Sequence, residues 1–212
     1  MNAPVLLIGA TGATGRQIIA KAREAGVELR VMARDPEKLA GVSCAVVQGD
    51  VLDPVSLRRA ARGVRAVVSA LGTPLLLRGP VTLLSEGTRN MVRAMESECP
   101  GARLLCVTGM GAGDSRGHGG FLYDRVILPL LLGRIYADKD RQEQVVMQSR
   151  LDWTVIRPAM LTDADATHAW REITSWSEQA RMTRISRADV AEFIVREVNT
   201  PRHRRAIVNL SE

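Results

Sequence analysis

Short aliphatic runs alternate with amphipathic segments from the beginning of the chain. Val5–Ile8 is entirely aliphatic and ends at a glycine cluster, which is typical of a strand buried on both faces of a parallel sheet. Residues 14–25 then place apolar side chains at helical spacing, and Gly26 stands where a helix C-terminus is capped. Residues 28–33 return to the strand pattern. This order predicts a strand, a helix and a second strand.

The same alternation continues to the end of the chain. Further strands are predicted at residues 44–47, 66–69, 103–108, 152–157 and 206–209. Further helices are predicted at 54–61, from about Pro80 to Pro100, and from a capping box formed by Ser186 and Asp189. The pattern predicts the α/β class: one Rossmann-type domain over residues 1–212, with a doubly wound parallel sheet between two layers of helices. The ligand site of such a sheet lies beyond the C-terminal ends of its strands.

The amino-acid composition makes a membrane-spanning protein and a nucleic-acid-binding protein both improbable. The 212 residues are 46% hydrophobic and 25% charged, which suits a soluble domain with a core, and no apolar run is long enough for a membrane helix. The net charge is +6, but the arginines are scattered and aromatic residues make up 3%, so we expect no nucleic-acid partner. No basic region precedes the first apolar run, and the three cysteines have no paired spacing. We therefore expect free thiols and a cytoplasmic location.

The strongest motif is the glycine-rich run that joins the first strand to the first helix. Its G-x-x-G-x-x-G pattern reads Gly9, Ala10, Thr11, Gly12, Ala13, Thr14, Gly15. The first glycine permits a tight turn, the second lets the backbone approach a pyrophosphate, and the third allows close packing of helix on strand. The helix N-terminus adds unpaired N–H groups, and Thr11 and Thr14 add hydroxyls. The run therefore predicts a dinucleotide site that includes Ala13.

The residue after the second strand indicates which dinucleotide is bound. An acidic residue there binds the adenosine 2′-hydroxyl, whereas a basic residue accepts a 2′-phosphate. The chain continues with Arg34, Asp35 and Pro36. We expect Arg34 to face the cofactor and Asp35 to turn outward and begin a turn, which favours NADP(H) over NAD(H).

Seven short segments carry a resemblance to a known family. The chain resembles the atypical short-chain dehydrogenase/reductases of the NmrA-like, NAD(P)H-binding group, in a pattern similar to flavin reductases of the biliverdin reductase B type. The segments are residues 9–15, 33–36, 49–51, 70–73, 85–90, 157–158 and 186–191. They span nearly the whole chain.

The resemblance implies further cofactor contacts. Asp50 would bind the adenine amine and Val51 would offer a backbone contact. The Ala70-Leu71-Gly72 turn would line the ribose and diphosphate. Thr108 and Gly109 would lie beside the nicotinamide, and Pro158 would border its carboxamide.

The acid–base machinery of the larger superfamily is incomplete here. Its dehydrogenases use a tyrosine and a lysine four residues later, whereas Tyr136 and Lys139 are three apart. Two helical residues at that spacing still share a face. Three alternatives stay open: a working pair, Lys139 as a lone cation near the cofactor, or surface residues. The candidate catalytic residues are thus Thr108, Tyr136 and Lys139, and dehydrogenation or isomerisation of a sugar nucleotide or steroid, which needs the pair, is disfavoured.

Weak acid–base machinery suits a reaction in which the cofactor carries the chemistry. Hydride transfer from NADPH to a planar acceptor, a flavin or quinone, mainly needs two rings held in contact. The hypothesis is therefore an NADPH-dependent reductase of a small planar molecule. The alternative is a non-catalytic regulator of the NmrA type that senses NADP(H).

Two segments lack the strand–helix rhythm and are predicted to build the substrate side. Residues 109–136 hold a glycine-rich stretch, His118 and the apolar run 126–132. This apolar run is interpreted as a lid over the substrate, a buried helix or a dimer face. Both a monomer and a homodimer are therefore open. Residues 159–186 carry Trp170 and Trp176, which either stack on a planar substrate or pack in the core. His168 has no second ligand at metal-binding spacing, so no metal site is predicted.

Overall fold

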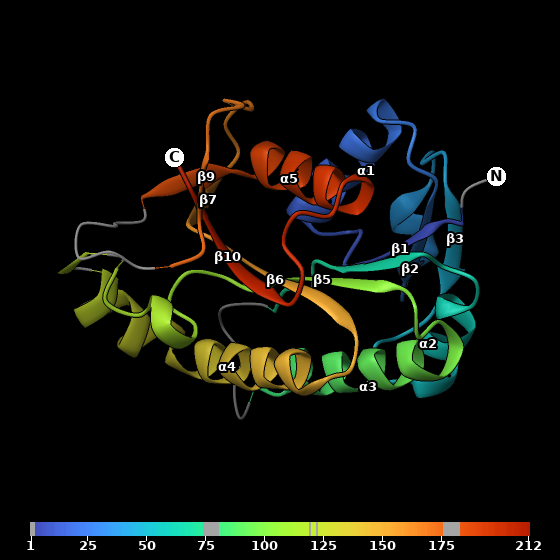
Figure 1. Ribbon diagram of the computed structural model, residues 1–212, viewed down its shortest axis with the longest axis horizontal. Coiled ribbons are helices and arrows are strands. Elements are labelled where there is room, and N and C mark those ends of the chain that lie inside the picture. The colour runs from blue at the N-terminus through green and yellow to red at the C-terminus, as the bar shows by residue number, and fades with distance from the viewer. Residues whose placement is uncertain (1–2, 74–80, 119, 122, 176–182) are drawn as a thin grey trace.

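An eight-stranded sheet forms the centre of the molecule (Figure 1). The computed structural model describes residues 3–73, 81–118, 120–121, 123–175 and 183–212. The strands of the sheet, in spatial order, are β3 (Ala45–Gln48), β2 (Leu29–Ala33), β1 (Val5–Ile8), β4 (Ala66–Ser69), β5 (Arg103–Val107), β6 (Asp152–Pro158), β10 (Ala206–Ser211) and β8 (Arg171–Ile173). Neighbours run parallel except β8, which is antiparallel to β10. The predicted doubly wound sheet is confirmed.

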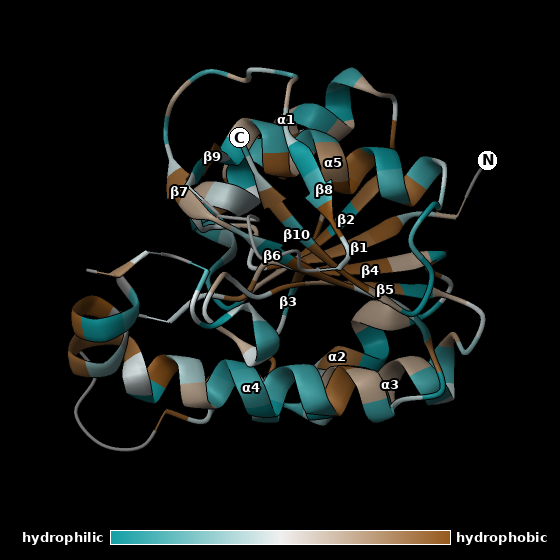
Figure 2. Ribbon diagram, turned by 60° about the vertical axis from the view of Figure 1, so that its left-hand side comes forward, coloured by the Kyte–Doolittle hydropathy of each residue, from teal (hydrophilic) through white to brown (hydrophobic). Residues whose placement is uncertain are grey.

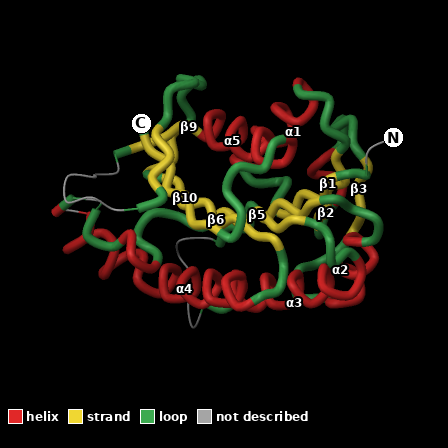
Figure 3. The backbone as a smooth tube through the Cα atoms, in the orientation of Figure 1, coloured by secondary structure: helices red, strands yellow, loops and turns green. Residues whose placement is uncertain are grey.

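Helices cover both faces of this sheet. One face carries α1 (Ala13–Glu24) and α5 (Arg187–Asn199), and the other carries α2 (Pro54–Ala61), α3 (Leu83–Glu98) and α4 (Gly133–Gln148), as Figures 1 and 3 show. Figure 2 shows the apolar strands enclosed between the two helical layers. The predicted α/β/α layering is therefore present.

Alternate residues of the central strands serve two separate cores. Val5 and Leu7 of β1 pack on the side of α1 and α5, whereas Leu6 and Ile8 pack on the side of α2, α3 and α4. Each of these side chains is at most 1% exposed. A strand buried on both faces has no polar alternation, which explains the continuous aliphatic runs in the sequence.

Helix N-termini are capped in two different ways. The Ser186 hydroxyl accepts the backbone N–H of Asp189 at 3.0 Å, as the capping box predicts, and the Asp189 carboxylate also accepts the backbone N–H groups of Thr167 and His168. At α3, Thr82 makes no side-chain cap bond, and the cap comes from another helix. The buried Asp138 carboxylate of α4 accepts the backbone N–H of Leu84 at 2.9 Å.

Several predicted boundaries shift in the structure. The helix expected from about Pro80 begins at Leu83, while Pro80 itself lies outside the described residues. The sixth strand continues through Pro158, and the last strand continues to Ser211. Pro158, which has no backbone N–H, is the last residue of β6, and the backbone N–H of Ala159 makes the next bond to β10, to the Leu210 oxygen at 2.8 Å.

The two segments expected to be irregular contain regular elements. Residues 159–186 form β7 (Met160–Thr162), β8 and β9 (Arg184–Ser186), and β7 pairs with β9 in a small parallel sheet. Residues 109–136 include a π-helical segment, Tyr123–Leu132, with Pro129 inside it. Leu130 and Leu131 in this segment are 76% and 71% exposed, so of the three alternatives for residues 126–132 the buried helix is wrong. Among the described residues, no helix is long and apolar enough to cross a membrane.

Candidate functional site

A cleft of about 610 Å³ opens where the strand order reverses, at the C-terminal ends of β1 and β4. The sheet extends from β1 through β2 to β3 in one direction and from β4 to β8 in the other. The cleft is lined by Ile8, Gly9, Thr11–Thr14, Met32–Arg34, Gly49–Val51, Ala70–Thr73, Leu83, Leu84, Val107, Thr108, Leu132, Ile135, Tyr136, Lys139, Leu161 and Arg187. It therefore joins most of the predicted cofactor and catalytic residues in one space.

The predicted glycine run makes the tightest contacts in the cleft wall. Gly9 has a φ of +86°, and a Cβ atom placed on it would lie 2.3 Å from the backbone oxygen of Ala70. A Cβ atom on Gly15 would lie 2.2 Å from the backbone oxygen of Gly9. These distances exclude any side chain. The turns after β1 and β4 thus touch through backbone atoms, and Gly15 packs beneath the cleft instead of lining it.

The N-terminus of α1 presents open backbone donors to the cleft. Its N-cap is Gly12, which has no side chain to accept a hydrogen bond, and its first turn has no acidic residue. Gly12, Ala13 and Thr14 all line the cleft. An anionic diphosphate supplies the acceptors that these N–H groups need. The arrangement therefore fits the pyrophosphate of a dinucleotide.

Arg34 and Asp35 separate as the sequence predicts. Arg34 lines the cleft, whereas the Asp35 carboxylate accepts the backbone N–H of Glu37 at 3.2 Å and caps a short 3₁₀ helix, Pro36–Leu39. Lys38 pairs with the same carboxylate. A cation is thus presented to the cleft where β2 ends, and the carboxylate of the next residue, Asp35, is used in a turn.

The loop after β3 is held by its own hydrogen bonds. The Asp50 carboxylate accepts the backbone N–H of Leu52 at 2.9 Å, and the Val51 backbone oxygen accepts the side-chain amide of Asn90 at 3.1 Å. A Cβ atom on Gly87 would lie 2.9 Å from the Val51 side chain, so α3 approaches this loop closely. Both Asp50 and Val51 therefore occupy fixed places on the cleft wall.

Tyr136 and Lys139 meet at the other end of the cleft. Lys139 Nζ donates a hydrogen bond to the backbone oxygen of Thr108 at 2.7 Å and lies 4.7 Å from the centre of the Tyr136 ring. A Cβ atom on Gly109 would lie 2.7 Å from this Nζ atom and 3.2 Å from the tyrosine oxygen, so glycine gives the pair its room. Desolvation of the ammonium lowers the pKa of Lys139 to about 8. The interpretation of both as surface residues is wrong.

A buried ionic network, absent from the sequence predictions, supports this end of the cleft. The Thr108 hydroxyl donates to Glu143 Oε1 at 2.7 Å, and Arg157 donates to the same carboxylate through Nε at 2.9 Å and Nη2 at 2.7 Å. The Glu143 and Arg157 side chains are both 2% exposed, and Arg157 also pairs with Asp114. The network joins Thr108, the residue after β5, to α4 and β6. No local motif reveals it, because its members lie far apart in the sequence.

Other predicted residues lie outside the cleft. Neither Pro158 nor Gly109 is among the lining residues, and the backbone oxygen of Pro158 accepts the backbone N–H of Met110 at 2.9 Å in the loop after β5. Trp170 is half-buried against the core, donates to Glu172 at 3.1 Å and stacks beside Arg196, which contradicts a role in stacking on a substrate. Trp176 lies outside the described residues. His118 is half-buried and does not line the cleft.

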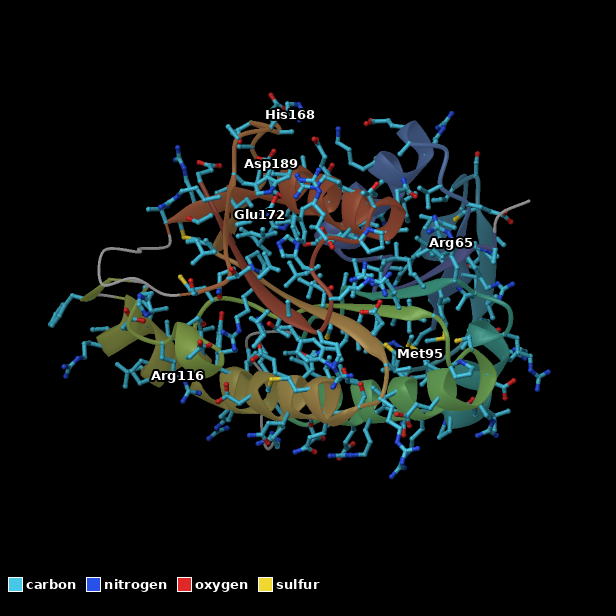
Figure 4. The ribbon with its side chains drawn as sticks, viewed as in Figure 1. Arg65, Met95, Arg116, His168, Glu172 and Asp189 are labelled. Carbon is cyan, nitrogen blue, oxygen red and sulfur yellow. The ribbon has the colours of Figure 1, made fainter. Side chains whose placement is uncertain are left out.

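No candidate metal centre accompanies the cleft in the described part of the chain. His168 lies on the α5 side of the sheet, beyond Asp189 (Figure 4), and its Nδ1 atom is 2.8 Å from Glu192. Among the residues whose positions are described, no three His, Cys, Asp or Glu side chains form a group that could hold a metal ion. Cys44, Cys99 and Cys106 are free, and burial raises the pKa of the Cys106 thiol to about 12, which makes it a poor nucleophile.

Comparison with known proteins shows the family to which the chain belongs. Residues 9–201 match the model of a family described as NAD(P)H-binding. The chain belongs to this NAD(P)H-binding family, which confirms the resemblance seen in its motifs.

One curated relative is a named reductase. The chain is 31% identical over 156 residues to (4-alkanoyl-5-oxo-2,5-dihydrofuran-3-yl)methyl phosphate reductase of Streptomyces griseus, a match that spans 73% of this chain and 46% of that protein. The chain thus covers less than half the length of this curated relative.

Solved structures share the fold over nearly the whole length. ChuY, an anaerobillin reductase from Escherichia coli O157:H7, is 24% identical with a TM-score of 0.81, and the match covers 99% of this chain and 97% of that one. A short-chain dehydrogenase/reductase from Veillonella parvula, solved with NADP, is 16% identical with a TM-score of 0.79, over 100% of this chain and 95% of that one. At these identities the similarity establishes the fold.

Proposed function

We propose that the protein is an NADPH-dependent reductase that transfers a hydride to a small planar acceptor, a flavin or a quinone, in the cytoplasm. One observation carries the proposal: a single cleft runs from Arg34 past the N-terminus of α1 to the pair Tyr136 and Lys139. Its lining has room for the parts of a dinucleotide and still leaves a wall for a second molecule. Free cysteines suit a reducing compartment.

The nucleotide end would bind and orient the cofactor. The α1 N-terminus and the glycine turn would hold the diphosphate, Asp50 and Val51 the adenine, and Arg34 the 2′-phosphate. Thr73 offers a further donor, since its buried hydroxyl has no hydrogen-bond partner within the described structure. When bound, NADPH supplies the hydride.

The other end would orient the acceptor and stabilise its charge. Leu132, Ile135 and Leu161 give an apolar wall suited to a flat ring system, and they exclude water from it. Lys139 Nζ, held on the Thr108 oxygen, keeps a positive charge there at neutral pH. That charge stabilises the negative charge that develops on an acceptor as it takes up a hydride.

The regulator is the second candidate because of one specific observation. The Thr108 hydroxyl donates its hydrogen to Glu143 instead of pointing it toward the cleft for catalysis. A protein with a complete nucleotide end and a hydroxyl held in this way could bind NADP(H) without turning it over. The named reductase relative favours the enzyme.

Two measurements test the proposal. Titration calorimetry gives the affinities for NADPH and NADH, and the loss of reduced-nicotinamide absorbance after addition of FMN or a quinone reports turnover. We expect tighter binding of NADPH and turnover with at least one acceptor. Arg34→Ala should weaken NADPH binding by about tenfold or more and leave NADH binding unchanged. Lys38→Ala is the matched control, because Lys38 is a nearby exposed cation outside the cleft. Binding of NADPH without turnover of any acceptor in a broad panel would contradict the reductase proposal and favour the regulator.

A further inference from the structure

Arg187, the first residue of α5, is a cation on the cleft wall to which neither the motifs nor the comparisons give a role. Its Nη1 atom lies 2.7 Å from the Asp163 carboxylate. Thr162 of β7 pairs with Ser186 of β9, so the residues that follow these two strands lie side by side at the cleft edge. The fold therefore places the Arg187 guanidinium there by strand register.

The partner of Arg187 is easily exchanged. The Asp163 side chain is 83% exposed, whereas the Arg187 side chain is 22% exposed. An ion pair with one well-solvated member adds little stability, because water competes for the carboxylate. The arginine, by contrast, is already largely ordered. Replacing Asp163 by another anion would cost little conformational entropy on the arginine side.

The charge of the cleft is unbalanced around Arg187. The charged residues among its described lining are three cations, Arg34, Lys139 and Arg187, and one carboxylate, Asp50. One oxygen of Asp50 is already used by the backbone of Leu52. Arg34 and Lys139 lie toward the two ends, where a 2′-phosphate and an acceptor ring are proposed. Within the described lining, the third cation is left without a counter-charge on the inside of the cleft.

The position of α5 shows where this cation can act. Helices α1 and α5 lie next to each other on one face of the sheet (Figure 1), and Lys21 of α1 lies 3.9 Å from Glu192 of α5. The residues at the start of both helices line the same cleft. Arg187 thus shares one cleft with the proposed diphosphate site at the start of α1 and with Leu161 of the apolar wall.

We propose that Arg187 is an oxyanion-binding residue of the cleft, which releases Asp163 and pairs with a phosphate or carboxylate of a bound ligand. This inference rests on the proposed nucleotide site. A guanidinium presents two parallel N–H donors that match the two oxygens of such a group. Two ligands could supply the oxyanion: the diphosphate of the cofactor, or an acid group on the acceptor. The chemistry is the same, and the experiment separates the sources.

The test compares Arg187→Gln with the matched control Arg184→Gln. Arg184 lies three residues earlier, is exposed, pairs with Glu212 and does not line the cleft. NADP⁺ binding is measured by calorimetry. Binding of FMN and of riboflavin, which lacks the phosphate, is measured by flavin fluorescence with NADP⁺ at saturation.

Each outcome has a defined meaning. A loss of NADP⁺ affinity of about tenfold in Arg187→Gln alone supports the proposal and identifies the diphosphate as the source. Unchanged NADP⁺ affinity, with FMN weakened and riboflavin unaffected, supports it and identifies the acceptor. Wild-type affinities for NADP⁺ and both flavins in Arg187→Gln overturn it.

A second variant covers the possibility that Arg187→Gln does not fold. Asp163→Asn removes the competing carboxylate and keeps its shape, so the affinity for the anionic ligand should rise by about twofold to fivefold, and the gain should shrink at high salt. An unchanged or lower affinity counts against the proposal. Failure of the wild-type protein to bind NADP⁺ would instead remove the proposed function, whereas binding without turnover would remove only its catalytic part.

Discussion

The two ends of the cleft are built by different means. At the proposed nucleotide end, backbone atoms of the turns after β1 and β4 touch directly, and Gly9 and Gly15 leave no space for side chains. At the end where we propose that the acceptor reacts, called the reacting end, side chains of α4, of β6 and of the residue after β5 meet, and a buried carboxylate, Glu143, joins Thr108 to Arg157. The first end depends on the absence of side chains, and the second depends on charge balance between them.

This difference predicts different responses to substitution. A substitution at the nucleotide end acts through steric exclusion, which charge or pH cannot relieve. A substitution at the reacting end that removes one member of a buried ion pair leaves the other ionised group desolvated and unpaired. Its effect on stability therefore depends on whether a charged partner is left for that group. The following substitutions separate the two kinds of response, from the largest expected effect to the smallest.

Gly9→Ala should destabilise the protein most. The new Cβ atom would meet the backbone oxygen of Ala70 at 2.3 Å in a residue whose φ is +86°, and we expect a loss of about 3 kcal/mol or more in the free energy of unfolding. Gly26→Ala is the matched control. Its φ is +64°, and a Cβ atom placed on it would have nothing within 4 Å, so it should lose only about 1 kcal/mol. Equal losses in urea unfolding would show that the turns after β1 and β4 are not in tight contact.

Glu143→Leu should destabilise the protein by about 3 kcal/mol, because it leaves the buried Arg157 cation without its two-oxygen partner and with Asp114 alone to pair with. Glu143→Gln keeps hydrogen-bond acceptors but removes the charge, and its loss should be smaller. Gln144→Leu, an exposed neighbour on the same helix, should stay within about 0.5 kcal/mol of the wild type. The folded fraction of Glu143→Gln should still bind NADP⁺ normally, and a loss of that binding would mean that the two ends are coupled.

If the proposed reductase activity is correct, it should depend on pH through Lys139. Its pKa is lowered to about 8, so the residue is charged below that pH and loses its positive charge as the pH rises through it. We expect kcat/KM for the acceptor to fall above about pH 8. Lys139→Met should lower kcat/KM at neutral pH by about tenfold and flatten this profile, whereas Lys139→Arg should keep activity at high pH. A wild-type profile without such a fall would argue against a charged Lys139 in the reaction.

Thr108→Val should have the smallest effect, a loss of about 1 to 1.5 kcal/mol in the free energy of unfolding, because it removes one hydrogen bond to a carboxylate that keeps both bonds from Arg157. Thr108→Ser should restore most of this loss. Since Lys139 binds the backbone oxygen of Thr108, the pH profile of Thr108→Val should match that of the wild type. A shifted profile would show that the hydroxyl itself affects the lysine.

The sequence allows prediction of the sheet and of the nucleotide end because both follow local rules. Aliphatic runs such as Val5–Ile8 reflect burial on both faces, and a glycine run between a strand and a helix has few other structural explanations. Asp35 can be assigned to the turn because Pro36 follows it, and the structure confirms that assignment. Each of these features depends on residues that are neighbours in the chain.

The reacting end does not follow such rules because its inner faces are polar. Helix α4 buries three polar residues, Asp138, Gln142 and Glu143, between the apolar Ile135 and Tyr136 at its start and Val146 near its end. The polar residues interrupt the apolar periodicity by which such a helix is recognised in a sequence. Trp170 is a candidate stacking residue in the sequence, but the paired strands that hold residues 159–186 direct it against the core. Side chains that meet across 14 to 35 residues leave no spacing signal.

The cap that Asp138 gives to α3 makes the stability of one helix depend on another, and it therefore affects the order in which they fold. The carboxylate that receives the first N–H groups of α3 belongs to a residue 54 positions later in the chain. During synthesis, α3 emerges first, but its leading turn acquires this acceptor only when α4 has docked beside it. The chain loses the conformational entropy of closing this long loop before the contact contributes any free energy. We therefore expect the two helices to form together, as one cooperative unit, late in folding. The amides of Leu84 and Ser85 would then exchange with solvent only when the two helices separate together.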